Sequence, residues 1–407
     1  MVKIMSPYEI LVGLAVPRPS GSGAAERTVR MIADYLGEQT SRLRVQEFYL
    51  RRFMQPVAGL FFLLSSLLCL RLVSKRRYWA ALAIALVIPS VYIAEFELNV
   101  PVASWVGGRT GVNVVADFLP ADELPERYIT FSAHYDSKTD LFDHEQRKPI
   151  HNFAPIAMAC LIASAALGIV SCRKKWAPGA HRLCFALGCL GVGGLAMLAL
   201  AFGGGLFMPP ELQSPGARDD GAAVAVLLSM AEEISASRVQ LEKTAVRFVF
   251  LGGEEVNMQG SAAYARAMPA WGDGFDRGII INSEFVGGEA PFCYWESSGT
   301  FLSKFQASDE AIRLYQDALA SLGFAPAVSA GSIFDDSGRL LSAELRAVTV
   351  GHADPEAPDT YHSVSDSIDR VVPEKLEQMK AVFLQMLSIL ERDDPLAGQF
   401  WGQATHP

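Results

Sequence analysis

Charged residues are scarce in this sequence, and the basic ones are in the minority. Only 19% of the 407 residues are Asp, Glu, Lys or Arg, and the formal net charge is −9. Binding to the phosphate backbone of nucleic acids requires an excess of Lys and Arg on one surface. We therefore expect no nucleic acid among the partners of this protein.

Cysteine is also scarce, with six residues in the chain. Five of them lie in or beside apolar segments: Cys69, Cys160, Cys172, Cys184 and Cys189. Only Cys293 lies in a polar region, so the sequence predicts no disulfide framework. The apolar run at the amino terminus is short, and PRPSGSG with a helix-like stretch follows it, which predicts that no signal peptide is cleaved.

Long apolar runs are abundant instead, because half of the residues are hydrophobic. Four runs stand out, at residues 57–73, 78–93, 153–170 and 183–208. Each can cross the roughly 30 Å of bilayer hydrocarbon as a helix. Buried helices of a soluble protein are the alternative, but four such runs exceed what one core needs. We expect an integral membrane protein with four transmembrane helices in two hairpins, residues 55–98 and 153–208.

The connectors within both hairpins are basic, and this bears on orientation. They contain Arg71, Lys75, Arg76 and Arg77 in the first hairpin, and Arg173, Lys174, Lys175 and Arg182 in the second. Short basic loops tend to stay in the cytoplasm, which predicts that the polar remainder of the chain is extracytoplasmic. Four arginines before the first span, at positions 42, 44, 51 and 52, favour the opposite orientation.

The polar remainder, residues 1–54, 99–152 and 209–407, is predicted to form one domain. Helical periodicity covers 24–39 and 222–236, and strand-like runs cover 44–53, 111–118, 127–132, 244–251 and 278–282. Short apolar strands that alternate with helices indicate an α/β fold whose sheet is covered on both faces. In such sheets, reactive residues gather at the carboxyl ends of the strands.

Acidic residues and histidines occur at these strand ends. The motifs are FSAHYDS with His134 and Asp136, PGARDDG with Asp219 and Asp220, FVFLGGEEV with Glu254 and Glu255, IIINSEF with Glu284, and DTYHSVSD with His362. Any one of these groups alone is usually structural or solvated. Together they predict a metal site, because zinc accepts imidazole nitrogen and carboxylate oxygen as ligands.

This set of motifs resembles the two-zinc aminopeptidase family, metallopeptidase family M28. The similarity runs from PRPSGSGAAERTVRMIADYL to YHSVSDSIDRV. The resemblance implies a three-layer zinc-exopeptidase fold with a mixed central sheet and two Zn²⁺ per chain. It further implies these roles: His134 and Glu284 hold one zinc, Glu255 and His362 hold the other, Asp219 bridges them, Glu254 is the general base, and Asp136 orients His134.

Three positions leave alternatives open. The family commonly has Asp where this chain has Glu284, which leaves metal binding intact but makes the substrate preference less secure. Asp220 is adjacent to Asp219 and could take the bridging position. In IFDDSGRLL, the side chains of Asp335, Asp336 and Ser337 could line the substrate pocket or cap a helix.

The expected function is hydrolysis of an N-terminal peptide bond by a membrane-bound enzyme, through a water molecule activated between the two zinc ions. Both hairpins are predicted to leave the domain near the catalytic rim, which favours membrane-associated peptides or lipopeptides as substrates. The spans could also be simple anchors. The alternatives are a carboxypeptidase or N-acyl amidase, a glutaminyl cyclase, or a catalytically silent membrane scaffold. Glu254 beside a complete ligand set argues against the scaffold.

Overall fold

The chain folds into two compact units, which we call the α/β unit and the helical unit. The computed structural model describes residues 4–105, 107–120, 125–174, 179–236, 239–300, 302–353 and 361–392. The α/β unit consists of Met1–Leu50, Arg109–Lys138 and Gln213–Pro407, and the helical unit of Arg51–Gly108 and Thr139–Leu212. The helical unit thus arises from two insertions into the chain of the α/β unit.

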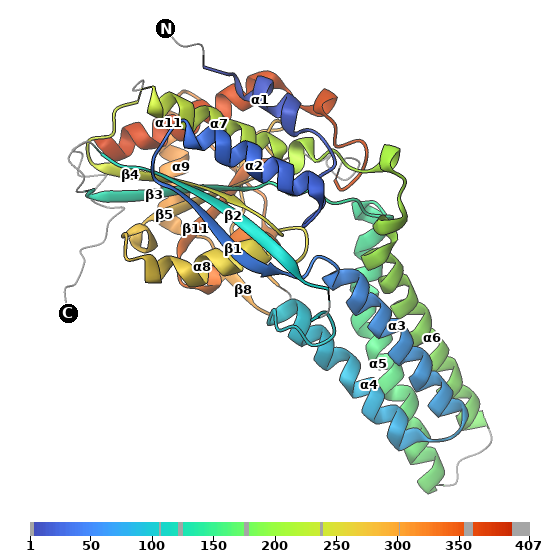
Figure 1. Ribbon diagram of the computed structural model, residues 1–407. Coiled ribbons are helices and arrows are strands. Elements are labelled where there is room, and N and C mark those ends of the chain that lie inside the picture. Colours follow the sequence, from blue (N-terminus) through green and yellow to red (C-terminus); the bar gives the residue numbers. More distant parts are fainter. Residues whose placement is uncertain are drawn as a thin grey trace, which may run out of the picture. The chain divides into compact units, whose positions relative to one another are not determined.

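An eight-stranded mixed sheet forms the centre of the α/β unit, as predicted (Figure 1). Its strands, in chain order, are β1 (Leu43–Leu50), β2 (Arg109–Phe118), β3 (Arg127–His134), β4 (Thr244–Leu251), β5 (Ile279–Glu284), β6 (Phe292–Tyr294), β9 (Val328–Ser329) and β11 (Arg346–His352). Their spatial order is β1-β2-β4-β3-β5-β11-β6-β9. Strands β4, β3, β5 and β11 are parallel neighbours, whereas β2 runs antiparallel to both β1 and β4. A small second sheet contains β7 (Ser297–Gly299), β8 (Lys304–Gln306) and β10 (Ser332–Ile333).

Helices cover both faces of the main sheet (Figure 1). On one face lie α1 (Pro7–Leu14), α2 (Gly23–Gly37), α7 (Ala222–Ser235), α9 (Asp309–Ser321) and α11 (Pro373–Glu391); on the other lie α8 (Gln259–Trp271) and α10 (Asp336–Ser342). Alternate residues of β4 enter the two cores, with Phe248 and Phe250 in one and Val249 and Leu251 in the other. Because β4 is buried on both sides, its sequence is a nearly continuous apolar run.

The ends of β3, β4, β5 and β11 form one edge of the main sheet, which we call the carboxyl edge. In the register, His134 at the end of β3 pairs with Leu251 at the end of β4. Because β2 is antiparallel, its first residue, Arg109, lies at the same edge, paired with Leu50 at the end of β1. The first insertion therefore leaves and re-enters the α/β unit at the carboxyl edge. The second insertion begins after Lys138, close in sequence to His134.

The helical unit is a bundle of long helices. They are α3 (Met54–Ser74), α4 (Tyr78–Tyr92), α5 (His144–Lys174) and α6 (Gly179–Gly203). A π-helical turn, η1 (Ile93–Glu97), continues α4, and a 3₁₀ turn, η2 (Gly204–Phe207), follows α6. Other short turns of the chain are η3 (Pro210–Leu212), η4 (Ala217–Gly221), η5 (Phe275–Arg277) and η7 (Ile368–Arg370).

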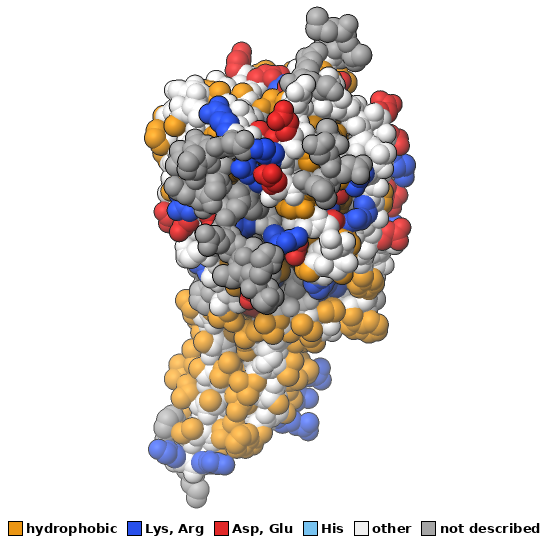
Figure 2. All heavy atoms as spheres, turned by 90° about the vertical axis from the view of Figure 1, so that its left-hand side faces the viewer, with side chains coloured by type: hydrophobic (Ala, Val, Ile, Leu, Met, Phe, Trp, Pro, Cys, Tyr) orange, Lys and Arg blue, Asp and Glu red, His pale blue; other side chains and the backbone are white. Residues whose placement is uncertain are grey.

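All four predicted apolar runs lie within these helices, which are long and apolar enough to cross a membrane. At most 39% of each apolar window is buried inside the bundle, so most of its apolar side chains face outward. Figure 2 shows hydrophobic side chains over the surface of the bundle. The helical unit extends beyond the predicted hairpins at 55–98 and 153–208, because α5 begins at His144 and the residues after η1 fold back onto the bundle.

Candidate active site

The structure brings all five predicted metal ligands together at the carboxyl edge. His134 and Glu284 end β3 and β5, and Glu255 follows β4. Asp219 lies in η4, directly before α7, and His362 lies in the segment after β11. All five side chains are buried, with at most 5% of their surface exposed. Their convergence follows from the parallel strands, whose ends meet at one edge.

Asp219 lies between the two histidines. Its Oδ1 is 3.0 Å from Nε2 of His134, and its Oδ2 is 3.3 Å from Nε2 of His362. Glu284 Oε2 lies 3.7 Å from the same nitrogen of His134, and Glu255 Oε2 lies 2.8 Å from the same nitrogen of His362. The five residues thus form two groups, each with one histidine and one glutamate, and the carboxylate of Asp219 reaches both groups.

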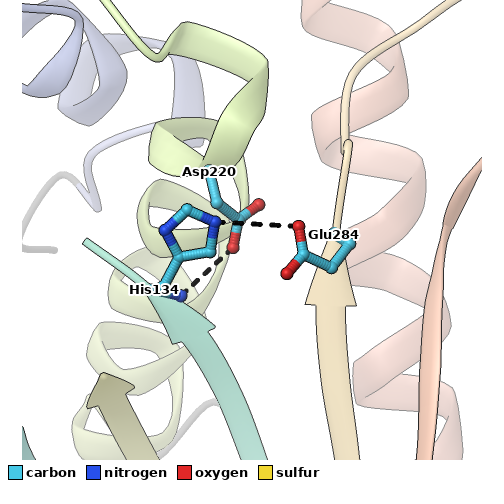
Figure 3. Close-up of side chains that lie close together, drawn as sticks. All are labelled: His134, Asp220 and Glu284. Atoms are coloured by element: carbon cyan, nitrogen blue, oxygen red, sulfur yellow. Dashed lines mark hydrogen bonds and ion pairs between the residues drawn. The ribbon is translucent and has the colours of Figure 1, made fainter. Parts of the chain in front are cut away.

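The neighbouring Asp220 has a different position. Its carboxylate accepts a hydrogen bond from the backbone N–H of His134, at 3.3 Å, while the carboxylate of Glu284 approaches the His134 ring from the end of β5 (Figure 3). An oxygen of Asp220 also lies near enough to His134 and Glu284 for the three to hold a metal ion. Asp219, however, contacts both histidines, so its geometry fits the bridging position better than that of Asp220.

The orientation of His134 follows from a backbone contact. Its Nδ1 lies 3.0 Å from the carbonyl oxygen of Asp136. A carbonyl can only accept, so Nδ1 carries the proton and Nε2 is left to face Asp219 and Glu284. The Asp136 carboxylate is farther from Nδ1, at 3.6 Å, and accepts hydrogen bonds from the hydroxyl of Ser20 and from the N–H of Gly253, at 3.1 Å. Asp136 therefore connects the end of β3 to the turn that precedes Glu254.

Two glycines shape the turn between β4 and the glutamate pair. Gly253 has φ of +72°, in the left-handed region that glycine adopts readily. A Cβ atom at Gly252 would lie 2.3 Å from the hydroxyl of Tyr135. After this turn, Glu254 is partly exposed whereas Glu255 is buried. The two adjacent carboxylates thus differ in access, and Glu254 is the one that can meet a substrate.

The carboxylates of this cluster carry more negative charge than its histidines can offset. Burial, opposed by His134, raises the pKa of Glu284 to about 8. Burial also raises the pKa of Glu254 well above its usual value. His134 opposes this rise, whereas the negative charges of Glu255 and Glu284 increase it. Burial alone would lower the pKa of His134, but Glu284, Asp136 and Asp219 raise it well above 6.5. These shifts all have the direction that an excess of carboxylates produces.

A divalent cation would relieve this imbalance. Oxygen atoms Oδ1 of Asp220 and Oε1 of Glu255 are buried and have no hydrogen-bond partner among the described residues, which is costly for a carboxylate. Three sets of residues each offer potential ligand atoms within 4.8 Å of one another: His134, Asp220 and Glu284; His134, Glu254 and Glu255; and Asp219, Glu255 and His362. Imidazole nitrogen with carboxylate oxygen is the donor set that zinc prefers. The residues present therefore fit zinc.

The family comparison agrees with this donor set. Residues 204–387 match the family model described as Peptidase family M28. This part of the chain is therefore similar to peptidase family M28. The match supports a zinc metallopeptidase, a hydrolase, as the motifs predicted.

Solved structures show the same fold. An aminopeptidase from Aneurinibacillus sp. strain AM-1 has a TM-score of 0.54 and 14% identity, over 95% of this chain and 93% of that chain. The zinc aminopeptidase BSAP from Bacillus subtilis has a TM-score of 0.53 and 14% identity, over 97% of each chain. A glutaminyl cyclase from Bacteroides thetaiotaomicron, bound to N-acetylhistamine, has a TM-score of 0.53 and 13% identity, over 94% of this chain and 96% of that chain. Comparison with curated proteins finds no match.

Arg18 supports the candidate site and was not assigned from sequence. It is completely buried, and its guanidinium donates hydrogen bonds to five backbone carbonyl oxygens, those of Leu14, Val16, Tyr135, Pro215 and Gly216. It thereby links the residue after His134 to the turn that leads to Asp219. The only sequence signal for this role is its place in the PRPSGSG motif.

Asp335 and Asp336 were predicted to line the pocket or to cap a helix. Asp335 immediately precedes α10 but makes no capping hydrogen bond. Its buried carboxylate instead accepts hydrogen bonds from three strand side chains, Ser298, Thr349 and Asn282, and from Ser337 in α10. Asp336 is buried, and burial raises its pKa to about 7. Asp335 is thus a buried hydrogen-bonding centre and not a helix cap.

Aromatic side chains flank two of the ligands. The ring of Phe285, directly after Glu284, lies 5.5 Å from that of Tyr361, between centroids. Tyr361 stacks on the neighbouring His362 ring at 3.7 Å, and Trp295 lies 6.3 Å from Phe285. An apolar surface therefore adjoins the polar ligand cluster, a combination typical of pockets for organic substrates.

Proposed function

We propose that this protein is a membrane-bound aminopeptidase with two zinc ions per chain. The observation that carries the proposal is the position of Asp219, whose two carboxylate oxygens each face a different histidine. In this proposal His134 and Glu284 would hold one zinc, Glu255 and His362 would hold the other, and Asp219 would contribute to both. Three carboxylate ligands would offset much of the charge of two Zn²⁺ ions, which could otherwise not lie close together.

Bound zinc would supply Lewis-acid chemistry, because it polarises the scissile carbonyl and lowers the pKa of water. Glu254 is the proposed general base. It takes a proton from the attacking water as the new C–O bond forms, and it delivers that proton to the amine nitrogen as the C–N bond breaks. Asp136 acts as a positioning residue, since its carbonyl orients His134 and its carboxylate holds Gly253 beside the base.

The aminopeptidase direction is supported by the surroundings of the ligands. The rings of Phe285 and Tyr361 provide an apolar surface for the side chain of the first substrate residue. The structures from Aneurinibacillus and Bacillus subtilis are described as aminopeptidases. A carboxypeptidase or N-acyl amidase would use the same ligands and base. Glutaminyl cyclisation is an alternative because a cyclase from Bacteroides thetaiotaomicron shares the fold.

Membrane attachment is the other part of the proposal. Arg71 in the last turn of α3 and Lys75, Arg76 and Arg77 in the α3–α4 connector are exposed, and short basic loops favour the cytoplasmic side. The catalytic unit would then be extracytoplasmic. Only residues 51–53 separate α3 from β1, which ends at the carboxyl edge. Peptides or lipopeptides held at the bilayer are therefore the proposed substrates.

The test uses the full-length protein in lipid nanodiscs, a peptide library and zinc analysis. We expect about two zinc ions per chain and the release of N-terminal residues. Glu254→Gln should keep the zinc and lose activity by about 10²- to 10⁴-fold, whereas the exposed Glu296→Gln should leave both unchanged.

Each alternative function predicts a different product. Release of C-terminal residues would indicate a carboxypeptidase, and loss of ammonia from an N-terminal glutamine would indicate a cyclase. Absence of both zinc and cleavage would support the scaffold. Full activity of Glu254→Gln would refute the proposed base.

A further inference from the structure

One loop of the helical unit is apolar on its outside. Between Leu98 and Trp105, directly after η1, the sequence LNVPVASW contains no charged residue. Leu98, Val100, Val102 and Trp105 are 46% to 65% exposed. Loops that face water are usually polar, and contiguous exposed apolar side chains mark surfaces that contact a partner or a membrane.

The polar groups of this loop point inward, toward Glu95. The Glu95 side chain is completely buried and belongs to η1. Its carboxylate accepts hydrogen bonds from the backbone N–H groups of Val102, Ala103 and Ser104, at 2.6, 2.5 and 2.9 Å. Nη1 of the buried Arg51 lies 3.1 Å from the same carboxylate, so its charge is paired.

Two further amides of the loop donate within the unit. The N–H of Leu98 donates to the carbonyl of Ile93 at 3.0 Å, and that of Val100 donates to the carbonyl of Ala94 at 2.7 Å. Pro101 has no N–H. The guanidinium of Arg51 also donates to the side-chain oxygen of Asn99. Lipid offers no hydrogen bonds, so a segment in contact with it must satisfy its backbone internally. Five of the seven backbone N–H groups between Leu98 and Trp105 are satisfied in this way.

The second insertion adds apolar residues at the same end of the bundle. Leu206 and Phe207 in η2 are 56% and 87% exposed. The rings of Phe96 in η1 and Phe202 near the end of α6 stack at 5.1 Å, so η1 and the end of α6 are neighbours. We call residues 98–105 together with Leu206 and Phe207 the apolar rim.

The opposite end of α4 carries a matching aromatic residue. Trp79, in the first turn of α4, is 64% exposed. From Trp79 to Leu98 the helix would cover roughly 30 Å, at about 1.5 Å per residue, which equals the thickness of bilayer hydrocarbon. Exposed tryptophans at both ends of such a span are typical of the two membrane interfaces. Trp105 in the apolar rim would therefore mark the second interface.

We propose that the apolar rim is a lipid-binding surface, which inserts into the outer acyl region of the bilayer around the end of the helical bundle. Arg51, which directly follows β1, belongs to the same end of the bundle through its contact with Glu95. With the proposed function as its basis, the inference specifies the substrates as peptides that a lipid chain anchors in that layer.

Tryptophan quenching tests the position of the rim without any turnover. The full-length protein is placed in nanodiscs whose lipids carry bromine near the headgroup end of the acyl chain. We expect Trp105→Phe to reduce the quenched fraction of the emission. Trp271→Phe, at a partly exposed position of the α/β unit, should not reduce the quenched fraction, because it removes emission that the lipid does not quench. Equal quenching of the wild type and Trp105→Phe would overturn the proposal, whatever the enzyme cleaves.

A charge in the rim tests its role with substrates. Val102→Asp should lower kcat/KM by about threefold or more for a peptide with a free N-terminus and a C-terminal acyl anchor, because a charge resists transfer into the acyl region. Its kcat/KM for the same peptide without the anchor should stay unchanged. Val328→Asp is the matched control, since Val102 and Val328 are 46% and 45% exposed. An equal loss for both peptides would overturn the substrate part. Absence of wild-type cleavage of either peptide would refute the proposed function and leave the quenching result standing.

Discussion

The carboxylate of Asp366 accepts a hydrogen bond from the backbone N–H of Asp219, with 3.2 Å between Oδ2 and the nitrogen. Its Oδ1 accepts a second one from the N–H of Arg218, at 2.8 Å. The two aspartates are 147 positions apart in sequence, and Asp366 lies shortly after His362. This contact fastens the segment that carries His362 to the turn that carries Asp219, and so holds together the two sides of the candidate metal site.

Replacing Asp366 should loosen this connection. Asp366→Asn exchanges one accepting oxygen for a donor that the N–H groups of Arg218 and Asp219 cannot use. We expect zinc affinity to fall by about 10- to 100-fold, as for other residues that orient metal ligands. Competition with a chelator of known affinity measures the change. Asp369→Asn, an exposed position nearby, serves as control and should bind zinc normally; equal affinities of the two variants would contradict the role of Asp366.

Gly351 in β11 leaves space for the backbone of Glu284. A Cβ atom at Gly351 would lie 1.8 Å from the carbonyl oxygen of Glu284, so Gly351→Ala must separate β5 from β11 at the ligand. We expect a loss of stability of about 1–3 kcal/mol, the usual cost of overpacking, together with reduced zinc content. Thermal unfolding and metal analysis provide the readouts. In Gly23→Ala the nearest atom is 3.7 Å from the new Cβ, and no loss is expected.

Removal of metal should destabilise the α/β unit. Without cations, Asp219, Glu255 and Glu284 are carboxylates buried close together, with two histidines between them. A ligand that binds only the folded state adds about 2.7 kcal/mol of stability at 100 times its Kd. We therefore expect chelation to lower the melting temperature and added zinc to restore it. Glu254→Gln should respond in the same way, because Glu254 is not among the proposed ligands. A melting temperature indifferent to chelator and zinc would contradict the metal site.

Lys380 in α11 lies outside the metal site, and its ion pairs should make the stability of the protein depend on pH. Burial would lower its pKa, but Glu233 and Glu377, at 2.8 and 2.9 Å from Nζ, raise it above 10.5. A folded-state pKa above the unfolded one gives stability that is complete below the unfolded pKa and is lost as the pH rises through the folded one. The melting temperature should thus fall above about pH 10.5.

The contribution of Lys380 can be isolated by comparison with variants. Lys380→Met should show a flatter fall in this pH window, while the exposed Lys304→Met should follow the wild type. Identical profiles for Lys380→Met and the wild type would show that the ion pairs contribute no pH-dependent stability.

Much of the fold was predictable where local pattern and burial agree. The strand predicted at 244–251 is β4, and the helix predicted at 222–236 is α7, which ends one residue earlier, at Ser235. Both are buried almost throughout, so their apolar character is continuous. The strand predicted at 44–53 ends instead at Leu50, because Arg51 turns into the network around Glu95. No local pattern reveals a partner 44 positions away.

The supports of the site were not predictable for a related reason. Arg18 acts through carbonyl oxygens of the backbone, and Asp366 acts through backbone N–H groups. Every residue except proline offers both groups, so the sequence of the partner contains no signal for the contact. The inward-facing hydrogen bonds of the apolar rim belong to the same class of contact.

By itself the sequence determined the chemistry of this protein: imidazoles and carboxylates at strand ends that suit zinc, and four apolar helices of bilayer length. The tertiary structure decided which carboxylate serves both histidines and which loop presents apolar side chains. The direction of Asp219 depends on a turn held by residues from distant parts of the chain. The exposure of the apolar rim depends on the hydrogen bonds that its backbone N–H groups donate to Glu95. Such directions come from packing and long-range hydrogen bonds, which residue type and spacing do not specify.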